Sequence, residues 1–201
     1  MTKRVPNMRK GRNITWMFSH KNEQSVFIDS FLEQTYANKL ELSPEVKAYA
    51  TQPESMHVNV GGKKCRYTPD FLVVNHDGTS TYVEVHHKAF INDEYLKKLD
   101  AAEQYINETT SSSFLLVDEG ELPLVVGKNI QMIVMNRNAT ELERVDVSQL
   151  PDVTTFAELY RLLSDDLEDP AAVIYELIAI KVFKYDECAI FSPSTQLMRA
   201  K

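Results

Sequence analysis

Two short apolar runs joined by a polar turn constrain the fold of this chain more than any other feature. Residues 67–74 read YTPDFLVV and residues 81–85 read TYVEV, with a turn-forming segment between them. Such runs on either side of an Asp-Gly pair predict an antiparallel β-hairpin. Each predicted strand carries one acid, Asp70 or Glu84, between apolar neighbours. Acids are depleted from strands, so these two carboxylates require an explanation.

The length and composition define the class of protein. A chain of 201 residues is long enough for one substantial domain with a small appendage, or for two small domains. It contains no apolar run near the roughly 20 residues of a membrane span, and its basic N-terminus lacks the apolar core of a secretory signal. Cys65 and Cys188 form no metal-binding pattern. We therefore expect a reduced, cytoplasmic protein.

Charge is distributed unevenly along the chain. The net charge is −7, yet residues 1–24 carry a local balance of +5 that includes Arg9, Lys10 and Arg12. A basic arm on an acidic body is suited to contacting phosphates locally without coating nucleic acid nonspecifically. The alternative is a solvated, disordered N-terminus.

The order of the predicted elements indicates an α/β domain with a mixed central sheet. Apolar spacing predicts helices over residues 24–41 and 92–108. Strands are predicted over 44–53, 56–60, 65–74, 81–90, 113–119 and 129–136, with a turn at Gly61-Gly62.

The character of the sequence changes near residue 145. Residues 146–163 contain a helix with an N-cap at Thr154 or Thr155 and Glu158 in its first turn. Residues 166–186 contain a second helix that starts near Pro170, and 189–197 suit a small hairpin. We therefore predict a basic arm over 1–23, a main domain over 24–145 and a winged-helix-like module over 146–201.

Three acids are candidates for a metal site: Glu33, Asp70 and Glu84. Hydrolysis of a phosphodiester needs a hard cation, and magnesium binds one or two carboxylates together with waters. Pro69 removes a ladder donor and bends the strand, which lets Asp70 face the neighbouring strand. The alternative interpretation is that Asp70 and Glu84 are partly exposed strand residues.

Several other polar residues lie near these acids in the sequence. On the strand predicted over 81–90, Glu84, His86 and Lys88 share one face. Lys63, Lys64 and Arg66 precede Asp70 and are suited to contacting DNA phosphates, or are ordinary charges of an exposed hairpin.

Four ordered segments resemble the N-terminal nuclease domain of the TnsA family. The segments are SFLEQ, VKAYATQPE, RYTPDFLV and YVEVHHK, and the resemblance covers roughly residues 20–120. TnsA proteins are endonuclease subunits of heteromeric cut-and-paste transposases. Their fold is restriction-endonuclease-like with a PD-(D/E)xK motif, and the segment from 173 to 197 is similar to their winged-helix-like C-terminal part.

The resemblance implies a role for individual residues. Glu33 matches the helix-borne catalytic acid, Asp70 the metal-bridging aspartate and Glu84 the acid of the ExK tripeptide, while Val85 would offer its carbonyl to the metal. The implied cofactor is Mg²⁺ or Mn²⁺. The implied partners are double-stranded DNA at transposon ends, a TnsB-like DDE transposase and a TnsC-like AAA+ regulator.

This sequence departs from the family pattern at position 86, where the catalytic lysine is replaced by His86. A histidine is shorter than a lysine and is mostly neutral near pH 7. Three interpretations stay open. In the first, the side chain of Lys88 reaches back to the site and replaces the lysine. In the second, His86 itself acts as general base or metal ligand. In the third, the site is weakened or inactive.

The resemblance predicts an endonuclease that hydrolyses the 5′-end strand at transposon ends. Two alternatives remain: a catalytically weakened or inactive TnsA-like assembly factor of the transposition complex, and a standalone nuclease of restriction or repair type.

Overall fold

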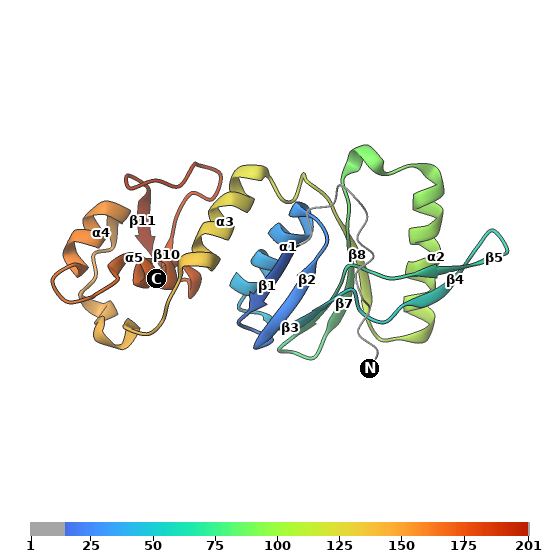
Figure 1. The fold of residues 1–201 in the computed structure, drawn as a ribbon, viewed down its shortest axis with the longest axis horizontal. Helices are drawn as coiled ribbons and strands as arrows, with labels where there is room; N and C mark the ends of the chain where they lie inside the picture. Colours follow the sequence, from blue (N-terminus) through green and yellow to red (C-terminus); the bar gives the residue numbers. More distant parts are fainter. Residues whose placement is uncertain (1–14, 201) are drawn as a thin grey trace. The chain divides into compact units, whose positions relative to one another are not determined.

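The structure, a computed structural model, describes residues 15–200 (Figure 1). It contains two compact units. Of the described residues, the first unit comprises 15–34 and Glu45–Asp118, and the second comprises Thr35–Pro44 and 119–200. The division therefore differs from the predicted boundary at residue 145, which falls inside the second unit. No helix within residues 15–200 is long and apolar enough to cross a membrane.

The first unit is built mainly of strands. They are β1 (Thr15–Ser19), β2 (Gln24–Ile28), β3 (Val46–Thr51), β4 (Met56–Val60), β5 (Lys63–Tyr67), β6 (Phe71–Asn75), β7 (Ser80–Val85) and β8 (Ser113–Val117). Its helices are the first turn of α1 (Phe31–Leu42), the short 3₁₀ helix η1 (Lys88–Phe90) and α2 (Asp93–Thr109).

A four-stranded mixed sheet in the order β3-β6-β7-β8 forms the centre of this unit. Strands β6 and β7 form the antiparallel hairpin predicted from the sequence, with Phe71 opposite Val83. Strand β8 runs parallel to β7, and α2 provides the crossover connection that a parallel pair requires. A mixed sheet flanked by helices confirms the predicted restriction-endonuclease-like α/β fold.

Strands β4 and β5 form a separate two-stranded ribbon that packs on α2. Gly61 and Gly62 make its turn with φ angles of 57° and 84°, in the left-handed region that glycine adopts without strain. The buried side chains of the ribbon and of α2 form one apolar cluster, whose members are Met56, Val58, Tyr67, Leu99, Ala102 and Ile106.

Several predicted elements of the first unit were wrong in type or extent. Residues 24–28 form β2, which pairs with β1, rather than the start of a helix. Helix α1 begins only after Ser30, whose hydroxyl accepts the Glu33 N–H. The strand predicted over 65–74 is interrupted between Tyr67 and Phe71, and the strand predicted over 81–90 ends at Val85.

The second unit is mainly helical. Its elements are the rest of α1, α3 (Leu124–Asn136), η2 (Leu142–Arg144), η3 (Val147–Gln149), β9 (Val153–Thr155), α4 (Phe156–Leu163), α5 (Pro170–Ala179), β10 (Phe183–Lys184) and β11 (Gln196–Arg199). The strand predicted over 129–136 is wrong, since these residues belong to α3. A short apolar run does not distinguish a buried helix from a strand.

The C-terminal part of this unit combines two helices with a small sheet. Helices α4 and α5 pack beside a three-stranded sheet in the order β10-β11-β9, and buried Leu159, Ile174 and Leu197 join them in one core. Thr155 caps α4 in a capping box with Glu158, as the sequence predicted, and Pro170 begins α5.

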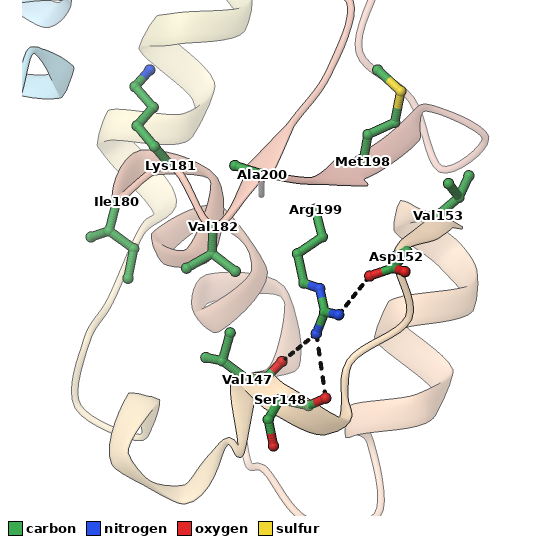
Figure 2. Close-up of a pocket in the computed structure, with 10 residues that line it drawn as sticks. All are labelled: Val147, Ser148, Asp152, Val153, Ile180, Lys181, Val182, Met198, Arg199 and Ala200. Carbon is green, nitrogen blue, oxygen red and sulfur yellow. Dashed lines mark hydrogen bonds and ion pairs between the residues drawn. The ribbon is translucent and has the colours of Figure 1, made fainter.

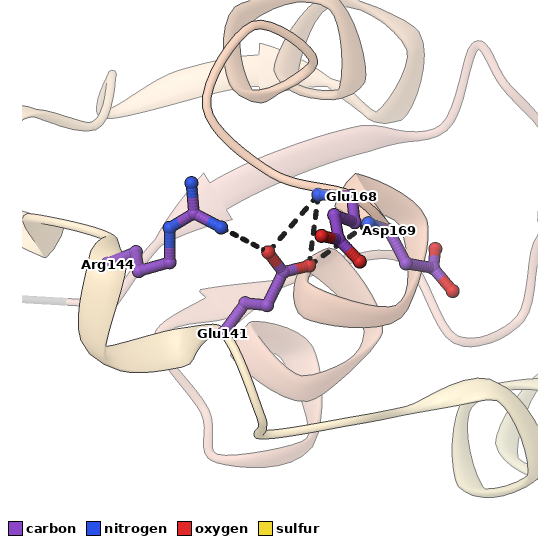
Figure 3. Close-up of polar contacts among 4 residues, drawn as sticks. All are labelled: Glu141, Arg144, Glu168 and Asp169. Atoms are coloured by element: carbon purple, nitrogen blue, oxygen red, sulfur yellow. Dashed lines mark hydrogen bonds and ion pairs between the residues drawn. The ribbon is translucent and has the colours of Figure 1, made fainter.

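The carboxylate of Glu141 organises the start of α5. The carboxylate of Glu141 accepts the backbone N–H groups of Glu168 and Asp169 at 3.1 Å each and the guanidinium of Arg144 at 2.6 Å (Figure 3). The N–H groups of Asp169 and Glu168, and beyond them Arg144, lower the pKa of Glu141 below its ordinary value. The ionised form of Glu141 therefore stabilises this end of the helix.

Replacing Glu141→Gln should make the protein less stable at neutral pH but not in acid. A carboxyl whose pKa is lowered by folding contributes stability that is present above its unfolded pKa and is lost as the pH falls through the folded value. The difference in melting temperature between wild type and Glu141→Gln should therefore narrow below about pH 4. Glu143→Gln, at an exposed neighbouring position, is the control and should change little. An equal difference at all pH values would contradict this account.

Candidate functional site

Asp70 and Glu84 lie opposite each other on neighbouring strands. Because Phe71 of β6 pairs with Val83 of β7 in antiparallel register, the next pair outward is Asp70 and Glu84. Like charges directly opposite each other destabilise a sheet. An arrangement that places two acids there has a cost in stability that an apolar pair would avoid.

The backbone fixes the orientation of Asp70. Its Oδ2 accepts the N–H of Val85 at 2.8 Å, and its main-chain carbonyl accepts the N–H of Gln52 at 2.7 Å. Pro69, buried just before it, has no N–H to continue the ladder, so the chain leaves β5 and enters β6 at this point. The Asp70 carboxylate is thereby held against β7 at the position of Glu84.

The electrostatic environment disfavours the ionised form of Asp70. Burial raises the pKa of Asp70 well above its ordinary value, and the negative charges of Glu84 and Glu33 raise it further. The hydrogen bond from the Val85 N–H opposes this shift without cancelling it. A proton or a cation placed between these carboxylates relieves the repulsion.

Two tyrosine hydroxyls hold the Glu84 carboxylate. Tyr67, the last residue of β5, donates to Oε2 at 2.7 Å, and Tyr95 of α2 donates to Oε1 through a short hydrogen bond. Glu84 is only 8% exposed, so these donors replace water around it. Burial, followed by the charge of Glu84, raises the pKa of both tyrosines far above the ordinary value, so both remain donors.

His86 lies just after the end of β7. Its main-chain N–H donates to the carbonyl of Val117 at 2.9 Å, and its imidazole ring stacks on the ring of Tyr95 with centroids 4.3 Å apart. The side chain is therefore linked to Glu84 through the tyrosine that both contact.

Lys88 does not share a strand face with Glu84, contrary to the prediction. The strand ends at Val85, and Lys88 belongs to η1. Its ammonium forms an ion pair with Asp118 at 3.1 Å, while the side chain remains 64% exposed.

Glu33 lies in the first turn of α1 and takes part in starting that helix. Its Oε2 accepts the N–H of Asp29 at 3.1 Å, while the Glu33 N–H donates to Ser30. Glu33 is buried, and its charge acts on Asp70. The residue therefore contributes to the negative potential at the site in addition to its capping contact.

The donor set suits a hard cation with few protein ligands. Within residues 15–200, no three His, Cys, Asp or Glu side chains form a group that holds a metal ion by themselves. Magnesium needs no such cage, because it retains waters and takes one or two carboxylates. The facing pair of Asp70 and Glu84, with mutual repulsion and oxygen donors only, fits this requirement.

The predicted DNA-binding residues fall into two groups. Lys63, Lys64 and Arg66 lie on β5 with exposed side chains. Arg9, Lys10 and Arg12 lie outside the described residues.

A pocket in the second unit contains none of the predicted site residues. It lies between β11, the end of α5 and η3, and Figure 2 shows Arg199 at its centre. The guanidinium donates to the carbonyls of Val147 and Ser148 and pairs with Asp152 at 2.5 Å. These contacts use three of the five guanidinium N–H groups and connect β11 to η3 and to Asp152 within this unit.

Tyr67 and Tyr95 are functional candidates that the sequence did not reveal. Tyr95 lies on the apolar face of a predicted helix, where it reads as a core residue. The signal is that a buried tyrosine hydroxyl needs a hydrogen-bond partner, and an acid on an adjacent strand is a suitable one.

Fold and site together define a nuclease-type domain: a restriction-endonuclease-like sheet with facing acids at adjacent strand positions. Residues 43–119 match the family described as TnsA-like endonuclease N terminal. This part of the chain is similar to TnsA-like endonuclease domains, the family that the sequence motifs predicted. The matched range contains Asp70, Glu84 and His86, whereas Glu33 precedes it. No curated protein sequence matches the chain significantly.

Removing the Tyr95 hydroxyl should destabilise the protein measurably. In Tyr95→Phe the Glu84 carboxylate loses one of its two phenol donors while remaining buried, which costs about 1.5–3 kcal/mol. Denaturant unfolding of the metal-free protein measures this loss. Tyr105→Phe, on the partly exposed side of the same helix, is the matched control and should cost much less. Equal effects of the two substitutions would mean that the Tyr95 hydrogen bond contributes nothing specific.

Proposed function

We propose that this protein is a metal-dependent DNA endonuclease subunit of a heteromeric transposase. It hydrolyses the 5′-end strand at transposon ends during cut-and-paste transposition. The observation that supports this most is the facing pair of Asp70 and Glu84 inside a TnsA-like endonuclease domain. The pair is destabilising by itself and is stabilised by a divalent cation.

Asp70 and Glu84 are the proposed ligands of Mg²⁺ or Mn²⁺, with the carbonyl of Val85 as a further oxygen donor. A cation at this position would neutralise the phosphate and lower the pKa of the attacking water. The Val85 N–H orients Asp70, and Tyr67 and Tyr95 orient Glu84, so both carboxylates are held in place before the ion binds. Glu33 adds negative charge beside Asp70 and is the third proposed acid.

His86 is the stronger candidate for the position of the family's lysine. Its ring contacts Tyr95, which in turn contacts Glu84, whereas the Lys88 ammonium is paired with Asp118. An imidazole nitrogen of His86 is proposed as the general base. Lys88 takes this role only if its ion pair opens.

The proposed partners follow from the domain type. Double-stranded DNA at transposon ends is the substrate, a TnsB-like DDE transposase cuts the other strand, and a TnsC-like AAA+ regulator joins the complex. A body with net negative charge suits an enzyme that relies on partners for much of its DNA affinity.

Asp70→Asn should separate the effect of the acid pair on the stability of the metal-free protein from its proposed role in metal binding. The amide still accepts the Val85 N–H but carries no charge, so the metal-free variant should be more stable than wild type, by up to about 1 kcal/mol. Millimolar Mg²⁺ or Mn²⁺ should raise the melting temperature of wild type and not of the variant. Thermal unfolding with chelator and with each metal measures both effects.

The control for this test is Asp100→Asn, at an exposed position of α2. It should behave as wild type in both conditions. Equal metal stabilisation of wild type and Asp70→Asn would refute the proposed site. If metal stabilises neither, and transposition products form equally with Asp70→Asn in the presence of the partner transposase, the protein is an assembly factor without catalytic activity.

A further inference from the structure

The ribbon formed by β4 and β5 has one apolar and one polar face. Residues opposite each other on antiparallel strands share a face, and those paired as Met56 with Tyr67 and Val58 with Cys65 belong to the cluster on α2. The intervening pairs, His57 with Arg66 and Asn59 with Lys64, are exposed on the other side. We refer to His57, Asn59, Lys64 and Arg66 as the outer face of the ribbon.

The ribbon carries positive charge that the rest of the protein does not neutralise. Residues 56–67 contain Lys63, Lys64 and Arg66 and no acid, in a chain whose net charge is −7. Within residues 15–200, no acidic side chain pairs with any of these three. A local excess of cations on an acidic protein fits a polyanionic ligand.

The shape of the ribbon fits a groove of duplex DNA. The ribbon extends past α2 and away from the four-stranded sheet (Figure 1). At its tip, no heavy atom lies within 4 Å of the positions that Cβ atoms would take at Gly61 and Gly62, so the tip is narrow and uncovered. A strand of five residues spans about 17 Å, and a two-stranded ribbon fits the major groove, which is about 12 Å wide.

We propose that the outer face of the ribbon binds in the major groove of duplex DNA and reads part of its sequence. This inference rests on the proposed function, since it assumes a DNA substrate. Arg66 and Lys64 have the donors that recognise guanine, and Asn59 has the donor and acceptor that recognise adenine. These proposed base contacts differ from the phosphate contacts expected from the sequence.

Tyr67 connects the ribbon directly to the acids. Tyr67 ends β5, packs in the apolar cluster on α2 and donates its hydroxyl to Glu84. The reading face and the metal site are thus parts of one packed structure, so DNA bound by the ribbon lies in a defined register relative to the scissile phosphate.

The test measures binding of the full chain to a pool of randomised duplexes, with calcium in place of magnesium. The variant is Lys64→Gln with Arg66→Gln, and the matched control is Lys97→Gln with Lys128→Gln, two exposed lysines elsewhere. The ribbon variant should lose at least about tenfold in affinity for the duplexes that wild type selects, and it should lose the preference for guanine in those duplexes. The control should change neither quantity.

Two further measurements examine the groove and the sequence reading. Wild type should protect guanine N7 from methylation by dimethyl sulfate in its selected duplexes, and the ribbon variant should not. Asn59→Ala should relax the preference for adenine at one position without changing the salt dependence. A duplex RNA should compete poorly, because its major groove is too deep and narrow for a ribbon.

The proposal is overturned if wild type binds no duplex, if the ribbon variant binds as the control does, or if RNA competes equally with DNA. These outcomes are distinguishable from failure of the proposed function. The ribbon variant should retain the metal-dependent gain in melting temperature, and Asp70→Asn should retain duplex binding. Loss of metal response with intact ribbon binding would refute the nuclease and leave the ribbon proposal standing.

Discussion

The repulsion between Asp70 and Glu84 is the constraint around which the first unit is organised. The hairpin register makes the two acids face each other, and burial prevents water from screening them. The surrounding elements each contribute one contact that keeps a carboxylate in place: β7 through the Val85 N–H, β5 through Tyr67 and α2 through Tyr95. The packing of β5 and α2 on the sheet thus serves the geometry of the site as well as the stability of the fold.

The two carboxylates accept different numbers of hydrogen bonds, and this difference distinguishes their roles. Glu84 receives two phenol donors and is fully surrounded by protein, whereas Asp70 receives one backbone donor and has a raised pKa. Asp70 is therefore the group that gains most from a neighbouring cation. The proposed cation would neutralise charge at Asp70 and so relieve the repulsion within the pair.

Much of the fold was predictable from sequence because its signals are local. The Asp-Gly turn, the Gly61-Gly62 turn, the helix over α2 and the Thr155–Glu158 cap all depend on residues near one another in the chain. The errors arose where tertiary contacts decide. Residues 24–28 form a strand because β1 pairs with them, and residues 129–136 are helical within α3. The tyrosine contacts to Glu84 were not predictable, since they join segments that periodicity alone does not bring together.

The most direct test of the central claim is a crystal structure of the protein with saturating Mn²⁺, with anomalous scattering recorded at the manganese edge. The account predicts an anomalous peak between the carboxylates of Asp70 and Glu84, with an oxygen of each within coordination distance. An anomalous peak only at another position would contradict the claim that this pair binds a divalent cation. The absence of any peak between the two carboxylates at saturating metal would contradict it as well.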